Sequence, residues 1–178
     1  MKNIFYLITT LSLLNNYISN GQEKRYKIGL NYLSPISGDY KYYNNVFGLG
    51  ILTQIDIYDI NNQFSIYGDI SPSYITGKGT YNVNKVYNQN SYFIPIHAGV
   101  NYRVNNFNIG LAGGFGYYNY NYDLIGLQRS SNLGFSHSST ITYDLEKFSV
   151  LFKYDNTILN NQYGISNSNI SIGGALRF

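Results

Sequence analysis

The chain has 178 residues, enough for one domain, and only 12% of them are charged, against roughly 25% in an ordinary soluble domain. The formal net charge is +3 and no run of basic residues occurs, which argues against nucleic acid as a partner. Cysteine is absent, so the sequence excludes disulfides, thiolate metal sites and a lipidated cysteine anchor. We expect no cofactor, and with two histidines we expect no transition-metal site.

The first part of the chain has the pattern of an export signal. Lys2 supplies a positive charge, and the apolar run 4–14 that follows is too short to cross a bilayer as a helix. Small residues at the spacing that a signal peptidase needs place the cut after Gly21. We therefore expect residues 1–21 to be a cleaved signal peptide and residues 22–178 to form one barrel domain.

The rest of the chain alternates apolar and polar residues with a period of two, which predicts β-strands with two different faces. In the last segment, for example, Ile170, Ile172 and Leu176 alternate with Ser171 and Ala175. Most segments are close to the 9 to 11 residues of a tilted transmembrane strand. In chain order, the eight predicted segments are 24–33, 46–58, 64–75, 92–104, 107–117, 133–145, 148–155 and 169–178.

The connections between these segments alternate strictly between long and short. This alternation is typical of outer-membrane barrels, in which long loops face the outside and tight turns face the periplasm. The predicted long loops, rich in Asn, Ser, Tyr and Gly, are 34–45, 77–90, 121–132 and 156–167, and the short turns are 59–63, 105–106 and 146–147.

Alternation alone does not say which face is inside, and a soluble lipocalin-like barrel would show the same period. Glycine favours the membrane barrel, because the polar face carries many glycines that a narrow interior needs and a water-facing surface does not. The apolar face is almost free of charge, as hydrocarbon requires. The polar-face glycines are Gly29, Gly48, Gly50, Gly99, Gly110, Gly114, Gly116, Gly134 and Gly173.

Segments 92–103, 141–150 and 170–178 resemble the small outer-membrane β-barrel family of Gram-negative bacteria, of the Bacteroidetes type. The resemblance implies an all-β, closed, antiparallel eight-stranded transmembrane β-barrel with up-and-down meander topology, located in the bacterial outer membrane. It also implies that the barrel-assembly machinery reads the final segment during biogenesis. The residues of this assembly signal are Ile170, Ile172, Gly174, Leu176 and Phe178.

The polar face carries nearly balanced charges, which should form ion pairs in a lumen of low dielectric. An eight-stranded interior is only wide enough for its own side chains, so we expect a closed polar lumen. A narrow pore for ions or small solutes, gated by the same network, is the alternative. The predicted lumen charge network is Arg25, Lys27, Asp56, Asp69, His97, Arg103, Asp144, Lys153, Asp155 and Arg177.

One pair of residues suggests catalysis. His137 and Ser139 would share one face of a strand, and the His-x-Ser pattern is similar to that of the lipid A deacylase barrels. The following residues, Thr140 and Ile141, depart from the Asn-Ala typical of that family, and Glu146 lies too far along the barrel to orient the imidazole. We therefore expect a protein that is not an enzyme, with a lipid A-modifying hydrolase using His137 and Ser139 as an alternative.

Two further expectations concern local structure. Pro95 inside a strand removes a ladder hydrogen bond and predicts a bulge there. The tyrosines outside the strand centres should divide between an exposed surface and an interfacial girdle. They are Tyr26, Tyr32, Tyr40, Tyr42, Tyr43, Tyr81, Tyr87, Tyr102, Tyr118, Tyr120, Tyr122, Tyr154 and Tyr163.

Taken together, these features predict a monomeric outer-membrane barrel with a structural or surface-interaction role. Its expected partners are outer-membrane lipids and lipopolysaccharide, the barrel-assembly machinery, and an extracellular ligand of the four long loops.

Overall fold

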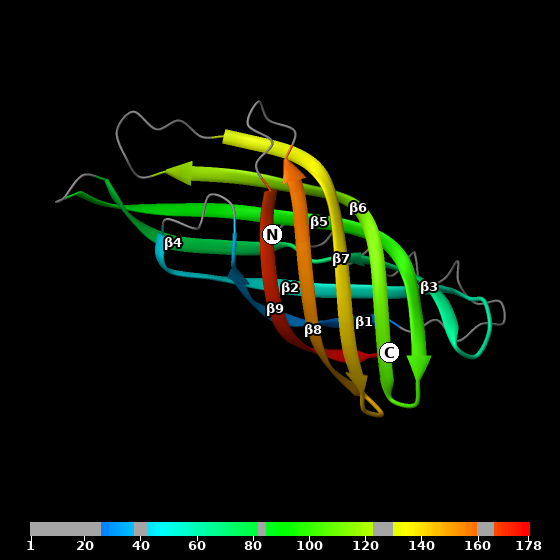
Figure 1. The fold of residues 1–178 in the computed structure, drawn as a ribbon. Helices are drawn as coiled ribbons and strands as arrows, with labels where there is room; N and C mark the ends of the chain where they lie inside the picture. The colour runs from blue at the N-terminus through cyan, green and yellow to red at the C-terminus, as the bar shows by residue number, and fades with distance from the viewer. Residues whose placement is uncertain (1–25, 38–42, 82–84, 123–129, 160–165) are drawn as a thin grey trace, which may run out of the picture.

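The computed structural model describes residues 26–37, 43–81, 85–122, 130–159 and 166–178, and these residues form one antiparallel sheet (Figure 1). No helix in the described ranges is long and apolar enough to cross a membrane. The strands are β1 (Tyr26–Pro35), β2 (Tyr43–Asp59), β3 (Phe64–Ile70), β4 (Ser73–Tyr81), β5 (Lys85–Val104), β6 (Phe107–Tyr122), β7 (Ser130–Asp144), β8 (Phe148–Leu159) and β9 (Ser166–Arg177).

The sheet closes into a barrel because the last strand pairs with the first. β9 runs antiparallel to β1 from Lys27 opposite Arg177 to Pro35 opposite Asn169. Backbone hydrogen bonds of 3.1 and 2.9 Å between Tyr26 and Phe178 continue this seam. β3 and β4 both lie between β2 and β5, so they are two parts of one wall position and the ring has eight positions. The predicted closed eight-stranded meander is therefore confirmed.

The predicted bulge at Pro95 is wrong. Pro95 lies opposite Gly116 in an unbroken register with β6, and β3 and β4 keep a single register along β5. Pro72, between β3 and β4, and Pro95, on β5, have no N–H group, so the ladder lacks donors there and the wall is divided into β3 and β4. The register shifts lie instead in β2, between Asp56 and Tyr58 and between Asn44 and Phe47.

The two faces of the strands have the predicted orientation. Apolar side chains point outward, with Leu30 70% exposed and Ile172 56% exposed, whereas inward-pointing polar side chains such as Lys153 are almost fully buried at 1%. Aromatic pairs mark both ends of the outer surface: Phe107 packs on Tyr143 at the end with short turns, and Tyr74 packs on Tyr92 near the other end. An apolar belt between aromatic girdles is the outer surface of a membrane barrel.

The predicted long loops are too long. β4 and β5 remain paired from Ser73 opposite Phe93 as far as Tyr81 opposite Lys85, so most of the loop predicted at 77–90 is a strand hairpin. Figure 1 shows this hairpin extending beyond the ends of β8 and β9. The other predicted loops are shortened in the same way by the ends of β1, β2, β6, β7, β8 and β9. Above the apolar belt the outward side chains are no longer consistently apolar, although the backbones remain paired. Hydropathy therefore indicates where the apolar belt ends and not where the strands end.

The short turns lie together at the opposite end, beside the C-terminus (Figure 1). The turn between β5 and β6 contains Asn105 with φ of 54°, a left-handed conformation that asparagine tolerates better than most residues. We call this end of the barrel the short-turn end and the other the long-loop end.

The strands are strongly staggered around the barrel. A line of paired residues that starts at Lys27 passes through Asp69, His97 and Ser136 and reaches Asn167 on β9. β9 has Asn169 opposite Pro35, so this line returns to β1 beyond Pro35 and not at Lys27. Closure with such a stagger tilts the strands against the barrel axis.

The inward glycines leave space that atoms of the neighbouring strands occupy. A Cβ on Gly114 would meet the carbonyl oxygen of Ile96, and one on Gly110 would lie 2.5 Å from the Thr140 hydroxyl and 2.6 Å from the Asn101 side-chain oxygen. The neighbouring Gly113 points outward, where a Cβ would meet only the Phe135 ring at 3.6 Å. The polar-face glycines therefore have the steric role that the sequence predicts.

Alanine substitutions at Gly113 and Gly114 test this role on adjacent positions of one strand. Gly114→Ala should destabilise the barrel by about 1 to 3 kcal/mol, because the new methyl group displaces backbone of β5. Gly113→Ala should change stability by less than about 0.5 kcal/mol. Urea unfolding in lipid vesicles measures both, and equal effects would contradict the assignment of the two faces.

Candidate functional site: the barrel lumen

The middle of the lumen holds a buried cluster of ionisable side chains from β3, β5 and β8. The Lys153 ammonium lies 2.7 Å from an Asp69 carboxylate oxygen and 3.2 Å from one of Asp155. His97 Nδ1 lies 3.3 Å from the same Asp69 oxygen and 3.9 Å from Asp155. All four side chains are buried. The Lys153 ammonium therefore contacts both carboxylates, and the His97 imidazole contacts both as well.

Hydroxyl groups extend this cluster across the barrel to β7 and β8. His97 Nε2 is 2.9 Å from the Ser136 hydroxyl, which also accepts a 2.9 Å hydrogen bond from Thr157. The order Asp69, His97, Ser136 has the connectivity of a hydrolase triad. All three side chains are buried, however, and Ser136 is 0% exposed, so the arrangement supports the wall and presents no exposed nucleophile.

A second group of charges lies near the short-turn end. Asp144 contacts Lys27 at 3.1 Å and Arg177 at 3.6 Å, and accepts hydrogen bonds of 2.7 Å from Asn108 and 2.5 Å from Ser149. This carboxylate joins the first strand to the last two, beside the seam that closes the barrel.

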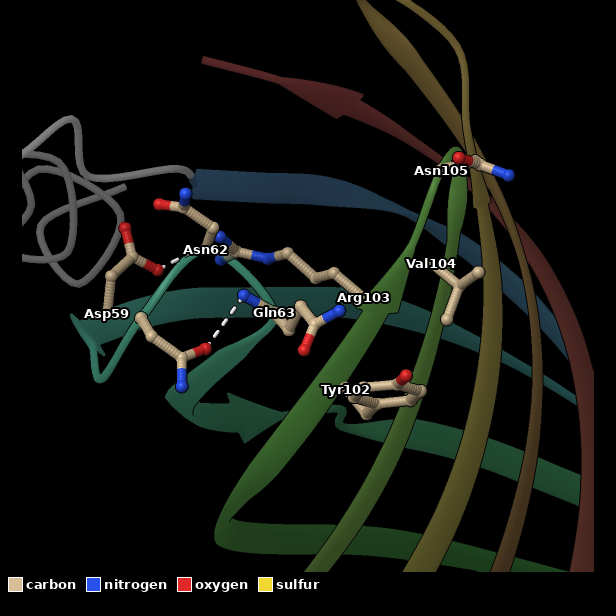
Figure 2. A pocket seen from close by; sticks show the side chains of 8 residues that line it. Asp59, Asn62, Gln63, Tyr102, Arg103, Val104 and Asn105 are labelled. Atoms are coloured by element: carbon tan, nitrogen blue, oxygen red, sulfur yellow. Dashed lines mark hydrogen bonds and ion pairs between the residues drawn. The ribbon is translucent and has the colours of Figure 1, made fainter.

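Arg103 forms ion pairs in the adjacent part of the short-turn end. Its guanidinium bridges Asp56 and Asp59, each at 2.9 Å. Figure 2 shows the Arg103 side chain reaching from β5 to Asp59 at the turn between β2 and β3. This turn, with Asn62 and Gln63, lines an open polar cavity of about 640 Å³. A smaller cavity of about 360 Å³ lies next to it, lined by Arg103 and Arg177 among others.

The long-loop end of the lumen is closed by apolar side chains, which we call the aromatic plug. Phe93 stacks on Tyr118 with ring centroids 4.3 Å apart, and Tyr118 stacks on Tyr120 at 5.5 Å. The hydroxyl groups of both tyrosines accept hydrogen bonds from amides of β9, from Asn169 to Tyr118 at 2.6 Å and from Asn167 to Tyr120. The plug consists of Leu33, Ile75, Phe93, Tyr118, Tyr120 and Leu159.

The aromatic plug corrects one sequence prediction. Tyr118 and Tyr120 belong neither to an exposed loop nor to an interfacial girdle, because they are inward residues of β6 and are buried. Tyr118 and Tyr120 continue the alternation in which Gly114 and Gly116 point inward. This strand parity is the sequence signal that predicts their place in the lumen. Tyr40, Tyr42 and Tyr163 lie outside the described residues.

The structure places nine of the ten predicted lumen charges in the three sets of contacts described above, around Lys153, Asp144 and Arg103. The tenth, Arg25, lies outside the described residues, as does the predicted signal peptide 1–21. In the described part of the chain, no three His, Asp or Glu side chains are arranged to hold a metal ion. The residues of the predicted assembly signal lie on the outer face of β9, where Ile172, Leu176 and Phe178 are exposed and Gly174 packs beside Phe148.

The structure gives the possible catalytic pair no contact with a carboxylate of the described residues. His137 and Ser139 lie on the outer face of β7, but no hydrogen bond joins them, and no described carboxylate contacts the imidazole. Glu146 is exposed in the turn between β7 and β8, at the short-turn end. The arrangement that would activate a serine nucleophile is therefore incomplete on the described residues.

Solved structures of outer-membrane proteins share this fold. No protein-family model matches the sequence, and no curated protein matches it. The structure of Ail, the attachment invasion locus protein of Yersinia pestis, in complex with the heparin analogue sucrose octasulfate matches with a TM-score of 0.64 at 16% identity, covering 88% of this chain and 100% of Ail.

Two further barrels match at similar coverage. The N-terminal β-barrel domain of Pseudomonas aeruginosa OprF has a TM-score of 0.53 at 13% identity, covering 89% of this chain and 100% of that domain. Neisserial surface protein A has a TM-score of 0.54 at 12% identity, with 88% and 98% covered. The chain has the fold of the small outer-membrane β-barrels.

Proposed function

We propose that this protein resides in a bacterial outer membrane as a closed, non-enzymatic barrel with a structural or surface-interaction role. The observation that carries the proposal is the combination of a closed wall, an apolar outer belt and a lumen filled in its middle and at its long-loop end. The Lys153 cluster occupies its middle and the aromatic plug its long-loop end. Hydrocarbon requires the first two features, and the third leaves no path for a solute.

In this proposal the short turns face the periplasm and the long-loop end faces outward. Residues 1–21 direct export and are removed, and the assembly machinery recognises the outer face of β9 through Ile170, Ile172 and Phe178. The barrel is a monomer surrounded by phospholipid and lipopolysaccharide, in a Gram-negative cell of the Bacteroidetes type. The connections around 34–45, 77–90, 121–132 and 156–167 are the surface for an extracellular ligand.

Membrane location is tested by fractionation together with a gel-shift assay. The protein should be recovered with outer membranes, and the unboiled sample should migrate differently from the boiled sample on a denaturing gel, because a closed barrel resists unfolding by detergent. Recovery in a soluble fraction with identical migration of the two samples would contradict the proposal.

Conductance tests whether the lumen is closed. The protein reconstituted in planar bilayers should show no channel steps, because two independent seals block the lumen. The variant Phe93→Ala/Tyr118→Ala removes part of the aromatic plug but keeps the Lys153 cluster, and it should also remain silent. Steps with the unmodified protein would favour the pore alternative.

A further inference from the structure

The outer face of the barrel carries a furrow that crosses three strands. Gly68, Ala98 and Gly113 are paired neighbours on β3, β5 and β6, and all three point outward. A Cβ on Gly68 would meet its nearest neighbour, the Ile57 side chain, at 3.5 Å, and one on Gly113 would meet only Phe135 at 3.6 Å. The floor of the furrow is therefore open, unlike the surroundings of the inward glycines.

Two rows of large apolar side chains form the walls of the furrow. Both rows follow the same strand pairing as the floor, one on its short-turn side and one on its long-loop side. An apolar cavity of about 360 Å³ lies at the Gly68 end. The rows are Ile66, Val100 and Leu111, and Ile70, Ile96 and Phe115, all of them exposed.

The opposite end of the furrow is polar. His137 is paired with Gly113, and Ser139 is paired with Leu111, so both side chains lie where the floor and one wall end. Within the described ranges, neither the imidazole nor the hydroxyl group has a hydrogen bond. By contrast, the next polar groups on this face, Tyr154 and Asn156, bond to each other at 3.3 Å and to serines of β9.

His137 is an unusual side chain for its position. Phe135 lies on its long-loop side and Ile141 on its short-turn side, both about half exposed, so the histidine is inside the apolar belt. It is the single His, Lys, Arg, Asp or Glu side chain that the described strands direct outward between the girdles. An ionisable group exposed to hydrocarbon is costly, and such groups usually have a polar partner and a function.

The furrow rises from one membrane half toward the other. Gly68 lies four residues from Phe64, the short-turn end of β3, whereas His137 lies seven residues from Asp144, the short-turn end of β7. The apolar part therefore points toward the centre of the membrane and the polar part toward the leaflet on the long-loop side. This is the orientation of a lipid in that leaflet.

We propose that the furrow binds one acyl chain of a lipid from the leaflet on the long-loop side. The chain lies over Gly68, Ala98 and Gly113, and His137 and Ser139 hydrogen-bond the ester, amide or hydroxyl group near the head of that chain. A single amphiphile thus fills the open floor and supplies the partners that the imidazole and hydroxyl group lack. The inference rests on the membrane location proposed above, which the gel-shift assay tests separately.

Native mass spectrometry of the full-length protein tests the proposal. Protein purified from outer membranes in mild detergent should retain one lipid per barrel, and its mass identifies a glycolipid or a phospholipid. In a second arm, protein refolded in detergent is incubated with either purified lipopolysaccharide or phosphatidylglycerol. Filling the furrow with Gly113→Leu should abolish retention, and His137→Ala/Ser139→Ala should reduce it at least tenfold.

Matched controls use the same outer face away from the furrow. Val150→Leu enlarges an apolar side chain on β8, and Thr76→Val removes a hydroxyl group on β4 that donates a hydrogen bond to the Asn90 side chain. Both should retain lipid as the unmodified protein does, and all variants should show the gel shift of a folded barrel.

Three results would overturn the proposal. The first is equal lipid retention by folded Gly113→Leu and unmodified protein. The second is a dimer lost in the furrow variants, which would assign the surface to a second copy of the chain. The third is release of free fatty acid that Ser139→Ala abolishes, which would make the site hydrolytic.

Discussion

Replacing Lys153 with methionine is expected to destabilise the barrel by about 3 to 5 kcal/mol, because it leaves two buried carboxylates without their shared cation. Among the described residues, Asp69 and Asp155 would then have His97 as their one possible positive partner. Methionine keeps most of the side-chain volume, so the loss reports the charge and not a cavity. Urea unfolding in lipid vesicles, followed by the gel shift, measures the change.

Two further variants separate this effect from a general effect of losing a lysine. Lys147→Met lies in the exposed turn between β7 and β8 and should leave stability unchanged. The double variant Lys153→Met/Asp155→Asn removes one of the stranded charges and should recover part of the loss. If Lys153→Met unfolds at the same urea concentration as the unmodified protein, the cluster does not stabilise the lumen as described.

Replacing Ile172 with arginine is expected to cost about 2 to 4 kcal/mol, the range for a cationic side chain on the lipid face near mid-depth. Ile172 is on the outer face of β9 and belongs to the strand that closes the barrel. The measurement is the free energy of unfolding in vesicles of defined lipid, because detergent micelles tolerate an arginine better than a bilayer does.

The adjacent residue provides the control for this prediction. Ser171 points into the lumen and its buried hydroxyl has no partner in the described structure, so Ser171→Ala should cost little. A large loss for Ser171→Ala together with a small loss for Ile172→Arg would mean that the two faces of β9 are reversed.

The sequence identified most of the lumen residues because strand parity is a local property. Once Ile172 and Leu176 are assigned to the outside, Ser171 and Ala175 must point inward, whatever the rest of the chain does. The same parity assigned Lys153 and Asp69 to the lumen. It did not show that these two side chains meet, since they are on β8 and β3, which are not neighbours.

Hydropathy was a poor guide to the ends of the strands. The segment 77–90 loses its apolar face above the membrane belt and therefore resembles a loop, yet its backbone remains paired from Tyr81 to Lys85. Tyr118 and Tyr120 were misplaced for the same reason. Backbone hydrogen bonds stabilise such a hairpin. Because every residue except proline can form them, the order of polar and apolar residues does not reveal them.

By itself, then, the sequence determined the number of wall positions, their antiparallel order, the face that each residue presents and the closing role of the last strand. Only the tertiary structure decided the stagger between strands. The stagger places Lys153 beside Asp69, closes the long-loop end with Phe93 and Tyr118, and aligns Gly68, Ala98 and Gly113 into one furrow. The physical reason is that register is set by contacts between residues far apart in the chain, whereas parity is set by the next residue along the strand.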